Sequence, residues 1–320
     1  MSVVLPVRDG EQFLEEALRS VLQQTYRDLE VIVVDDHSVD SSPTIVRAAA
    51  EVDDRVRLVA SRGSGISAAL NTGFREAGGD WVARMDADDV CRVDRIERQI
   101  SASRERPEVI AWASWGMAID AAGRTISSIR TGPTSDQELR RTLASGGIIA
   151  ILHSTVLVRR DSVLNAGGYD SQFDGAEDVE LWDRIVDSGP ILTLPEPLVL
   201  CRAHADSYST ERLARTIEIH QFVAARRRAR NAGRVLSFEE FVKARAAAPG
   251  PVRLARHLAV LGRLHYRAAG NHYAAGQLLR CSRRLICAAA LNPIYTFGAL
   301  RRQVLRRDDR LQEQAGSAAW

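Results

Sequence analysis

Apolar residues in the first hundred positions follow two patterns that alternate along the chain. Short, nearly continuous apolar runs are typical of strands buried on both faces of a sheet, and they predict strands at 3–7, 31–34, 56–60 and 81–85. Between these runs, apolar residues recur at three- and four-residue spacing, which predicts helices at 13–22, 41–52 and 66–77. Ser41 and Pro43 provide a hydroxyl cap and a first-turn proline for the second helix. This alternation predicts a mainly parallel sheet flanked by helices.

The rest of the chain divides into a less regular α/β part and a helical part. We predict further strands at 109–119, 124–130 and 151–158, and helices at 136–143, 160–166 and 176–186. From residue 211 the pattern is helical, with a break at 248–251 and a small-residue rhythm across 265–293 that predicts a packed helical hairpin. We therefore expect two domains, residues 1–210 and residues 211–320.

The net charge of +2 conceals two regions of opposite sign. Residues 211–320 contain 21 Lys and Arg against 7 Asp and Glu, whereas residues 1–210 contain 22 against 34. A basic helical surface can bind nucleic acid, an anionic membrane or an anionic partner. It can equally be the solvated face of a helical extension, and the charge pattern leaves these alternatives open.

Composition limits the class of protein and its compartment. The chain is 45% hydrophobic and 26% charged, as in an ordinary globular protein. Four cysteines at spacings that match neither a zinc site nor a disulfide framework predict free thiols. The first residues enter a strand pattern without a basic flank, and no apolar run reaches about 20 residues. We expect a cytoplasmic protein, with peripheral attachment at the inner face of the cell membrane as an option.

Acidic residues gather where the predicted strands end. The sequence ARMDADD, residues 83–89, places three carboxylates after the strand at 81–85, and Asp35-Asp36 ends the strand at 31–34. Such residues alone often form only a solvated turn. Parallel strands, however, deliver their following loops to one edge of the sheet, where ligands bind. Two carboxylates one residue apart can share a hard cation that neutralises a phosphate-rich ligand. The sequence therefore predicts a nucleotide site at this edge.

Four segments together resemble the family 2 glycosyltransferases, inverting nucleotide-sugar enzymes of the GT-A fold. They occur in the family's order and spacing from Val3 to about Ser209, and they read VVLPVRDGEQFLEEALRSVLQQTYRDLEVIVVDDHSVDSS, GISAALNTGFREAGGDWVARMDADD, GGYDSQFDGAEDVELWDRI and CRAHADSYS. The resemblance implies a Rossmann-like α/β domain with a helical C-terminal extension. It also implies a nucleotide-sugar donor, for which a UDP-sugar is favoured over a GDP- or dTDP-sugar.

The resemblance implies roles for residues on the donor side. Asp36 would hydrogen-bond the nucleotide base, and the pocket around the nucleotide would be formed by Pro6, Val7, Arg8, Glu11, Gly65 and Asn71. Many relatives have an aromatic residue and an asparagine where this chain has Arg8-Asp9, so a ring that could stack on the base is absent. A guanidinium plane can also stack on a ring.

The resemblance also implies a metal site. Asp86 and Asp88 match the motif that holds Mn²⁺ or Mg²⁺ and the diphosphate, with Asp88 as the direct ligand and Asp86 on the ribose side. Arg84 and Ala87, within the same motif, are further expected contacts of the donor. His204 matches a position that touches the metal or the diphosphate in some relatives. Cys201 replaces a frequent tyrosine nearby, which weakens that match.

On the acceptor side, the resemblance points to the helix predicted at 176–186. Asp178 matches the general base, Glu177 stands beside it, and Trp182 would lie near the acceptor. Acidic residues in a first helical turn also favour the helix dipole, so both carboxylates have a structural alternative. The expected acceptor is a hydroxyl of a glycan or a lipid-linked molecule in surface polysaccharide or cell-envelope synthesis.

Two other functions are weighed. A nucleotidyltransferase on a related sheet would usually carry a glycine-rich, lysine-bearing loop, which PVRDGEQFL is not. A nucleic-acid-binding protein would account for the basic C-terminal region, but no nucleic-acid motif is present and the sheet-edge loops are acidic. We therefore expect no nucleic-acid partner.

Overall fold

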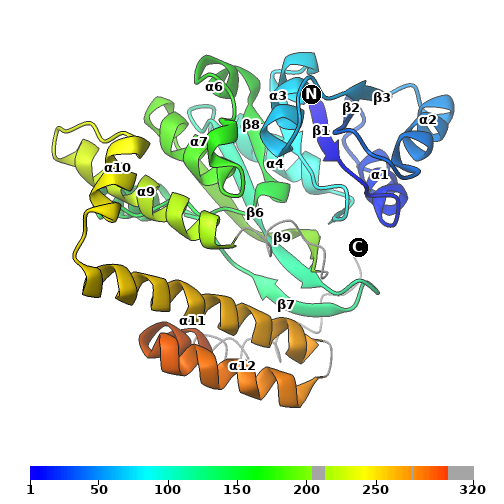
Figure 1. Cartoon of the computed structure of the whole chain (residues 1–320). Coiled ribbons are helices and arrows are strands. Elements are labelled where there is room, and N and C mark those ends of the chain that lie inside the picture. The colour runs from blue at the N-terminus through cyan, green and yellow to red at the C-terminus, as the bar shows by residue number, and fades with distance from the viewer. Residues whose placement is uncertain (204–212, 275–276, 302–320) are drawn as a thin grey trace. The chain divides into compact units, whose positions relative to one another are not determined.

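The computed structural model describes residues 1–203, 213–274 and 277–301 (Figure 1). The chain folds into two compact units, Met1–His204 and Ala205–Trp320. Each unit is described by itself below.

The first unit is built on one nine-stranded sheet (Figure 1). The strands are β1 (Ser2–Val7), β2 (Glu30–Asp35), β3 (Val56–Ala60), β4 (Trp81–Arg84), β5 (Val90–Cys91), β6 (Ala111–Ile119), β7 (Thr125–Ile129), β8 (Leu157–Arg159) and β9 (Ile191–Arg202). Their order is β3-β2-β1-β4-β8-β6-β9-β5, with β7 paired to β6. The strands β1 to β4 pair in parallel, and β8 joins this half to β6 through antiparallel pairs. The predicted mainly parallel α/β sheet is confirmed.

Helices connect the strands of this sheet. They are α1 (Leu14–Leu22), α2 (Ser42–Val52), α3 (Ile66–Glu76), α4 (Arg95–Glu105), α5 (Asp136–Ala144), α6 (Arg160–Asn165) and α7 (Glu177–Ile185). The apolar face of α3 packs against β1 and β2, and the buried residues of α1 belong to the same core, which explains the continuous apolar runs of these strands. Gly73 of α3 lies so close to Val4 and Val34 that a Cβ atom would overlap them, so this glycine permits close packing of helix on sheet.

Two local predictions are wrong. Ser41 precedes α2, but its side chain makes no capping hydrogen bond. The strand predicted at 151–158 is interrupted, because His153–Thr155 forms a 3₁₀ turn, η1, and β8 begins only at Leu157. The buried Thr155 explains the turn, since its hydroxyl donates to the carbonyl oxygen of Leu152 at 2.7 Å and accepts from the backbone N–H of Ser114.

The second unit is helical in its described part. It contains α9 (Leu213–Asn231), α10 (Phe238–Ala246), α11 (Gly250–Ala274) and α12 (Leu278–Leu291), and residues 293–301 are also helical. The predicted hairpin is present as α11 and α12, where Gly262 makes room for Asn292 and the Asn292 amide donates to the carbonyl oxygen of Ala259. Among the described helices, none has the length and apolar character needed to span a bilayer. The four cysteines are free thiols, as predicted.

Candidate functional site

The loops after β1, β2 and β3 meet at one edge of the sheet. The backbone N–H of Asp9 donates to Ser38, and the N–H of Val39 donates back to the Asp9 carboxylate at 2.8 Å. Asp9 and His37 both have positive φ angles, of 50° and 60°, a backbone region that non-glycine residues rarely adopt. The sharp turns bring side chains from separate loops together, as the parallel topology predicts.

Asp36 lies at the centre of these loops and is 5% exposed. Both of its carboxylate oxygens accept from the backbone N–H of Gly65, at 3.0 and 3.2 Å, and Arg8 approaches one oxygen at 3.6 Å. Gly65 has a φ of 96°, and a Cβ atom there would meet the carboxylate of Asp174 at 2.8 Å. The carboxylate of Asp36 therefore fixes the loop before α3 while an exposed guanidinium lies beside it.

The remaining predicted donor-side residues occupy different positions. Pro6 and Val7 are buried at the end of β1, and the backbone N–H of Glu11 donates to Asp40 in the neighbouring loop. Asn71 lies on α3, where its side-chain amide makes two hydrogen bonds of 2.8 Å with the backbone of Tyr169. Asn71 thus joins α3 to the turn before α7.

The acidic loop after β4 forms a cluster of three carboxylates. One carboxylate oxygen from each of Asp86, Asp88 and Asp89 lies within 4.8 Å of the others. Ala87 of this loop lies beside Gly10 of the first loop, whose added Cβ atom would meet it at 3.7 Å. Burial and the charges of Asp86 and Asp88 raise the pKa of Asp89 to about 8. Clustered carboxylate oxygens are the donor set that Mg²⁺ and Mn²⁺ prefer, so these residues fit a divalent cation.

Residues far away in the sequence hold the acidic loop in place. The hydroxyl of Ser154, in the 3₁₀ turn, accepts from the backbone N–H of Asp86 at 3.0 Å. Arg202, at the end of β9, donates from its backbone to Asp89 and from its guanidinium to the carbonyl oxygen of Asp88. The same guanidinium reaches Glu16 at 2.7 Å and lies over the ring of Phe13. The loop is therefore tied to separate segments of the fold.

A buried arginine stands between the acidic loop and the start of α7. Arg84 is 4% exposed and forms an ion pair with Asp86. Burial opposes the charge of Arg84, but the pairing with Asp86 raises its pKa, so the guanidinium stays charged. The charge of Arg84 also acts to lower the pKa of Glu177 and of Asp178, which places both carboxyls within its electrostatic reach.

The start of α7 carries two carboxyls with raised pKa values. Burial and the charge of Asp178 raise the pKa of Glu177 to about 7. Burial also raises the pKa of Asp178, although the N–H of Val179 at the helix start opposes this. Asp178 is only partly buried, whereas Glu177 is 8% exposed and accepts from the N–H of Gly175 at 2.7 Å. As a whole residue, Asp178 is the more exposed of the two.

A cluster of aromatic side chains and His153 lies against Glu177. His153 contacts the Tyr169 hydroxyl at 3.0 Å and approaches Glu177 at 3.9 Å, and burial keeps the pKa of this imidazole well below its usual range. Trp182 is fully buried, with its ring 5.9 Å from that of His153. Trp182 therefore packs inside the protein, next to His153 and the start of α7.

The sequence prediction missed several residues of this site. Ser154, Arg202 and Asp174 are among them, and Asp174 accepts a 2.5 Å hydrogen bond from Ser67 beside Gly65. The polar triplet 153–155 inside an otherwise apolar run was a usable signal for the turn that carries Ser154. His204, predicted near the metal, lies outside the described residues.

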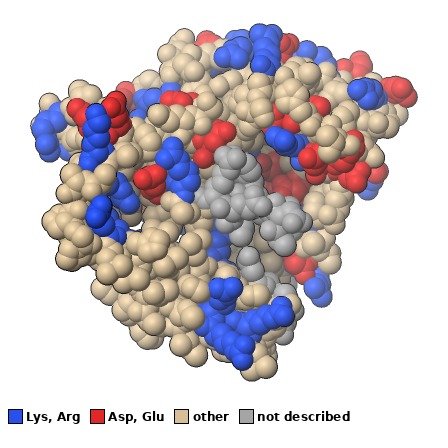
Figure 2. Space-filling model, viewed as in Figure 1, with Lys and Arg blue, Asp and Glu red and all other residues tan. Residues whose placement is uncertain are grey.

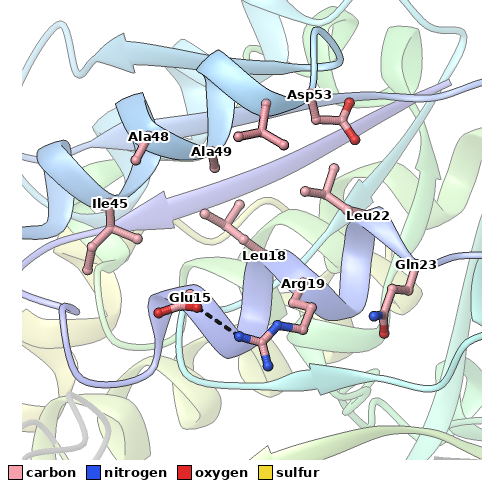
Figure 3. A pocket seen from close by; sticks show the side chains of 10 residues that line it. Glu15, Leu18, Arg19, Leu22, Gln23, Ile45, Ala48, Ala49 and Asp53 are labelled. Carbon is pink, nitrogen blue, oxygen red and sulfur yellow. Dashed lines mark hydrogen bonds and ion pairs between the residues drawn. The ribbon is translucent and has the colours of Figure 1, made fainter.

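A groove of about 450 Å³ lies elsewhere, between α1 and α2 (Figure 3). Leu18 and Leu22 face Ile45 and Ala49 across it, and Glu15 pairs with Arg19 at its rim. None of the predicted site residues lines this groove, so it is separate from the chemistry described above.

Comparisons with known proteins agree with this architecture. An uncharacterised glycosyltransferase of Haemophilus influenzae is 33% identical over 203 residues, which is 62% of this chain and 73% of the relative. The amylovoran biosynthesis glycosyltransferase AmsE of Erwinia amylovora is 31% identical over 64% of this chain and 76% of that protein. Among solved structures, Staphylococcus aureus TarS 1–349 in complex with UDP-GlcNAc matches with a TM-score of 0.57 at 14% identity, covering 90% of each chain.

A second solved structure extends the likeness. The mannosyltransferase PcManGT of Pyrobaculum calidifontis, in complex with GDP-Man and Mn²⁺, matches with a TM-score of 0.51 at 22% identity, over 95% of this chain and 79% of that one. The sheet and its helices therefore define a GT-A fold. The model of the family described as "Glycosyl transferase family 2" matches residues 2–167, and the chain belongs to that family, as its motifs predict.

Proposed function

We propose that the protein transfers a sugar from a nucleotide-diphosphate donor to a hydroxyl of a glycan or glycolipid, with inversion at the anomeric carbon. Residues 1–210 are the catalytic domain in this proposal, and residues 211–320 are a basic helical C-terminal region. The product would belong to surface polysaccharide or cell-envelope glycan, in line with the amylovoran biosynthesis named for one relative. The reaction would take place in the cytoplasm or at the inner face of the cell membrane.

One observation carries the proposal. The buried guanidinium of Arg84 pairs with Asp86 of the acidic loop and acts electrostatically on Glu177 and Asp178. Asp86, which could help to hold the diphosphate, and Asp178, which could take a proton, thus both lie near the fixed positive charge of Arg84. Displacement of a nucleoside diphosphate by a hydroxyl needs both of these functions.

On the donor side, the loops after β1 to β3 would hold the nucleotide. Asp36 would accept a hydrogen bond from the base, with Pro6, Val7, Arg8, Glu11, Gly65 and Asn71 around the nucleotide. Arg8 lies beside Asp36 and is exposed, which suits a guanidinium that stacks on the base. A UDP-sugar is the favoured donor, because structural neighbours were solved with UDP-GlcNAc and with UDP, although GDP-Man accompanies another.

At the leaving group, Asp88 and Asp86 would hold Mn²⁺ or Mg²⁺, with Ala87 and Arg84 next to the diphosphate. Two neighbours were solved with Mn²⁺. The bound cation would supply Lewis-acid stabilisation of the departing diphosphate. His204 is kept as a further proposed contact of this group.

At the acceptor, Asp178 would remove the proton of the attacking hydroxyl. Asp178 is the more exposed of the two acidic residues at the start of α7, and its raised pKa makes it a better base than an ordinary aspartate. Glu177 would lie beside this base, and the buried Trp182 would lie near the acceptor site. With one base and no second nucleophilic carboxylate in the proposal, a single displacement inverts the anomeric carbon.

The test is donor hydrolysis by the full chain. The protein is incubated with a panel of UDP-, GDP- and dTDP-sugars, with and without Mn²⁺, and slow release of the nucleoside diphosphate is measured. We expect release from a UDP-sugar only when the cation is present, and none from an Asp88→Ala variant. Full release in excess EDTA would contradict the metal assignment, and no release from any donor would contradict the proposed reaction.

A further inference from the structure

One stretch of the second unit contains no carboxylate side chain. Residues 250–301 include eight arginines and three histidines but neither aspartate nor glutamate. Where α11 and α12 are visible in Figure 2, their atoms accordingly appear blue or tan, without red. This stretch is therefore positive at every pH near neutrality.

Exposed apolar side chains are concentrated in the same stretch. Of the thirteen large apolar side chains that are exposed among the described residues, seven belong to it: Val252, Leu254, Leu278, Leu279, Ile286, Ile294 and Phe297. Leu279 is 81% exposed, Ile286 is 69% exposed and Ile294 is 89% exposed. Large apolar side chains gathered at the surface indicate an interaction site.

The spacing on α12 places two of these side chains on the same side of the helix. Cys281 and Ala288, seven residues apart, are its buried residues. At 100° per residue, Leu279, Ile286 and Ala290 fall on the opposite side of the helix. Arg283 lies among them and is also exposed. The outward face of α12 therefore combines an apolar stripe with positive charge.

The helical residues after Pro293 add two more exposed apolar side chains. Ile294 and Phe297 are both exposed and are three positions apart, so they share one side of the helical segment 293–301. We name the outward residues of α12 together with these two the α12 face: Leu279, Arg283, Ile286, Ala290, Ile294 and Phe297.

We propose that the α12 face lies on the surface of an anionic lipid membrane. Its apolar side chains enter the boundary between headgroups and acyl chains, while Arg283 and the neighbouring Arg280 and Arg284 bind lipid phosphates, as in other interfacial amphipathic helices. The proposal rests on the proposed function for its purpose, because membrane attachment would bring the enzyme to a lipid-linked acceptor. It goes beyond that function by naming the residues that make the contact.

Charge decides between a membrane and a second copy of the chain. In a two-fold dimer, the same patch of each copy would face its equivalent. Arg283 and its arginine neighbours Arg280 and Arg284 would then meet like charges, and this stretch has no carboxylate to pair them. An anionic bilayer supplies that negative charge and an apolar layer beneath it. A nucleic acid supplies the charge but no layer for Leu279, Ile286 and Phe297.

Vesicle binding of the full chain tests the proposal. Vesicles of phosphatidylcholine alone are compared with vesicles of phosphatidylcholine and phosphatidylglycerol in equal parts, by flotation at low and high salt. We expect binding only to the anionic vesicles and weaker binding as salt rises. Ile286→Asp and Phe297→Asp should each lower the partition coefficient at least about tenfold, because each removes a large apolar contact and adds a repelled charge.

The matched control is Val235→Asp, which makes the same kind of change at a side chain that is 96% exposed and lies outside the α12 face. It should bind vesicles as the wild type does. Equal binding to both kinds of vesicle, or no effect of Ile286→Asp, would overturn the proposal. So would a wild-type dimer that Ile286→Asp converts to a monomer in light scattering, since the α12 face would then be a self-interface. Donor hydrolysis by the wild-type protein is measured without vesicles on the same preparations. If the protein binds anionic vesicles but hydrolyses no donor, the result contradicts the proposed enzyme activity and not the membrane contact.

Discussion

The backbone N–H of Arg202 donates a 2.8 Å hydrogen bond to the carboxylate of Asp89, which lies 113 residues earlier in the chain. The guanidinium of the same arginine donates to the carbonyl oxygen of Asp88 and is almost fully buried. The shape of the acidic loop therefore depends on the end of β9. A carboxylate cluster held in this way keeps its oxygens close together despite their mutual repulsion.

Arg202→Met should destabilise the fold and loosen the acidic loop. Hydrogen bonds to a charged group contribute about 1.5–3 kcal/mol each, so we expect a loss of at least about 2 kcal/mol in urea unfolding. The Mn²⁺ concentration for half-maximal donor hydrolysis should rise. Glu16→Gln is the control, because it breaks the ion pair at the far end of the guanidinium without touching the loop. An equal effect of both variants on Mn²⁺ would show that the contact with the loop is unimportant.

Asp178→Asn should lower turnover by about a hundredfold or more, because the amide keeps the shape of the side chain but cannot accept the proton. Donor affinity and melting temperature should stay close to those of the wild type. If Asp178 only favoured the helix start, its removal would cost about 0.3–1 kcal/mol of stability and little rate. A near-normal rate would move the base to Glu177, and Glu177→Gln is the next variant to measure.

Glu177 should make the metal-free protein less stable as the pH rises. Its pKa is about 7 in the folded state, above the ordinary value of 4.5, so the folded protein binds the proton more tightly than the unfolded chain. The resulting stabilisation is complete below an ordinary glutamate pKa and is lost as the pH rises through about 7. Urea unfolding of wild type and Glu177→Gln at several pH values measures it. The stability difference between the two should move in favour of the variant between about pH 5 and pH 8, and a constant difference would contradict the raised pKa.

Asp36→Ala should weaken the binding of free UDP about tenfold. This is the change in dissociation constant that corresponds to losing about 1.5 kcal/mol, the contribution of one hydrogen bond to a charged group. Asp36 also holds the N–H of Gly65, so a loop effect must be separated from a contact with the base. Asp40→Ala provides that comparison, because Asp40 likewise holds loop N–H groups, those of Glu11 and Ser42. Isothermal titration with UDP measures both. Equal losses in the two variants would remove Asp36 from base recognition.

Arg8→Ala tests how this chain compensates for an absent aromatic ring. Arg8 is exposed and lies 3.6 Å from Asp36, so it can stack on a base that Asp36 binds. We expect weaker binding of UDP with unchanged stability, since an exposed ion pair contributes little to folding. Arg62→Ala is the control, because Arg62 is similarly exposed and pairs with Glu76 instead. Unchanged UDP affinity in Arg8→Ala would exclude the stacking role.

The strands of the parallel half were predictable because burial on both faces alone determines their apolar sequence pattern. β1 and β2 are covered on both faces, so every position from Val3 to Leu5 must be apolar, and the run is visible without any partner. The family motifs likewise led to the acidic loop and the start of α7. Both kinds of signal are local, since each lies within a few consecutive residues.

The residues that support the site could not be found in that way. Ser154 and Arg202 hydrogen-bond to residues of a loop 68 and 113 positions earlier in the chain, and no spacing rule links such positions. Asn71 was expected in the nucleotide pocket from its motif, but the structure also gives it two hydrogen bonds to Tyr169. A motif identifies a conspicuous residue, whereas its hydrogen-bond partners depend on the whole fold.

The 3₁₀ turn at His153–Thr155 has a consequence for how this protein could change. Three β-branched apolar residues at these positions would satisfy the strand pattern and could extend β8 toward the acidic loop. The sheet would gain regularity, but Asp86 would lose the hydroxyl of Ser154, and Glu177 would lose its aromatic neighbour His153. A more regular sheet at these positions would therefore remove two contacts of the proposed site. The regularity of the sheet and the contacts of the proposed site therefore make opposite demands on these three residues. A library randomised at 153–155, scored for both stability and donor hydrolysis, would test this.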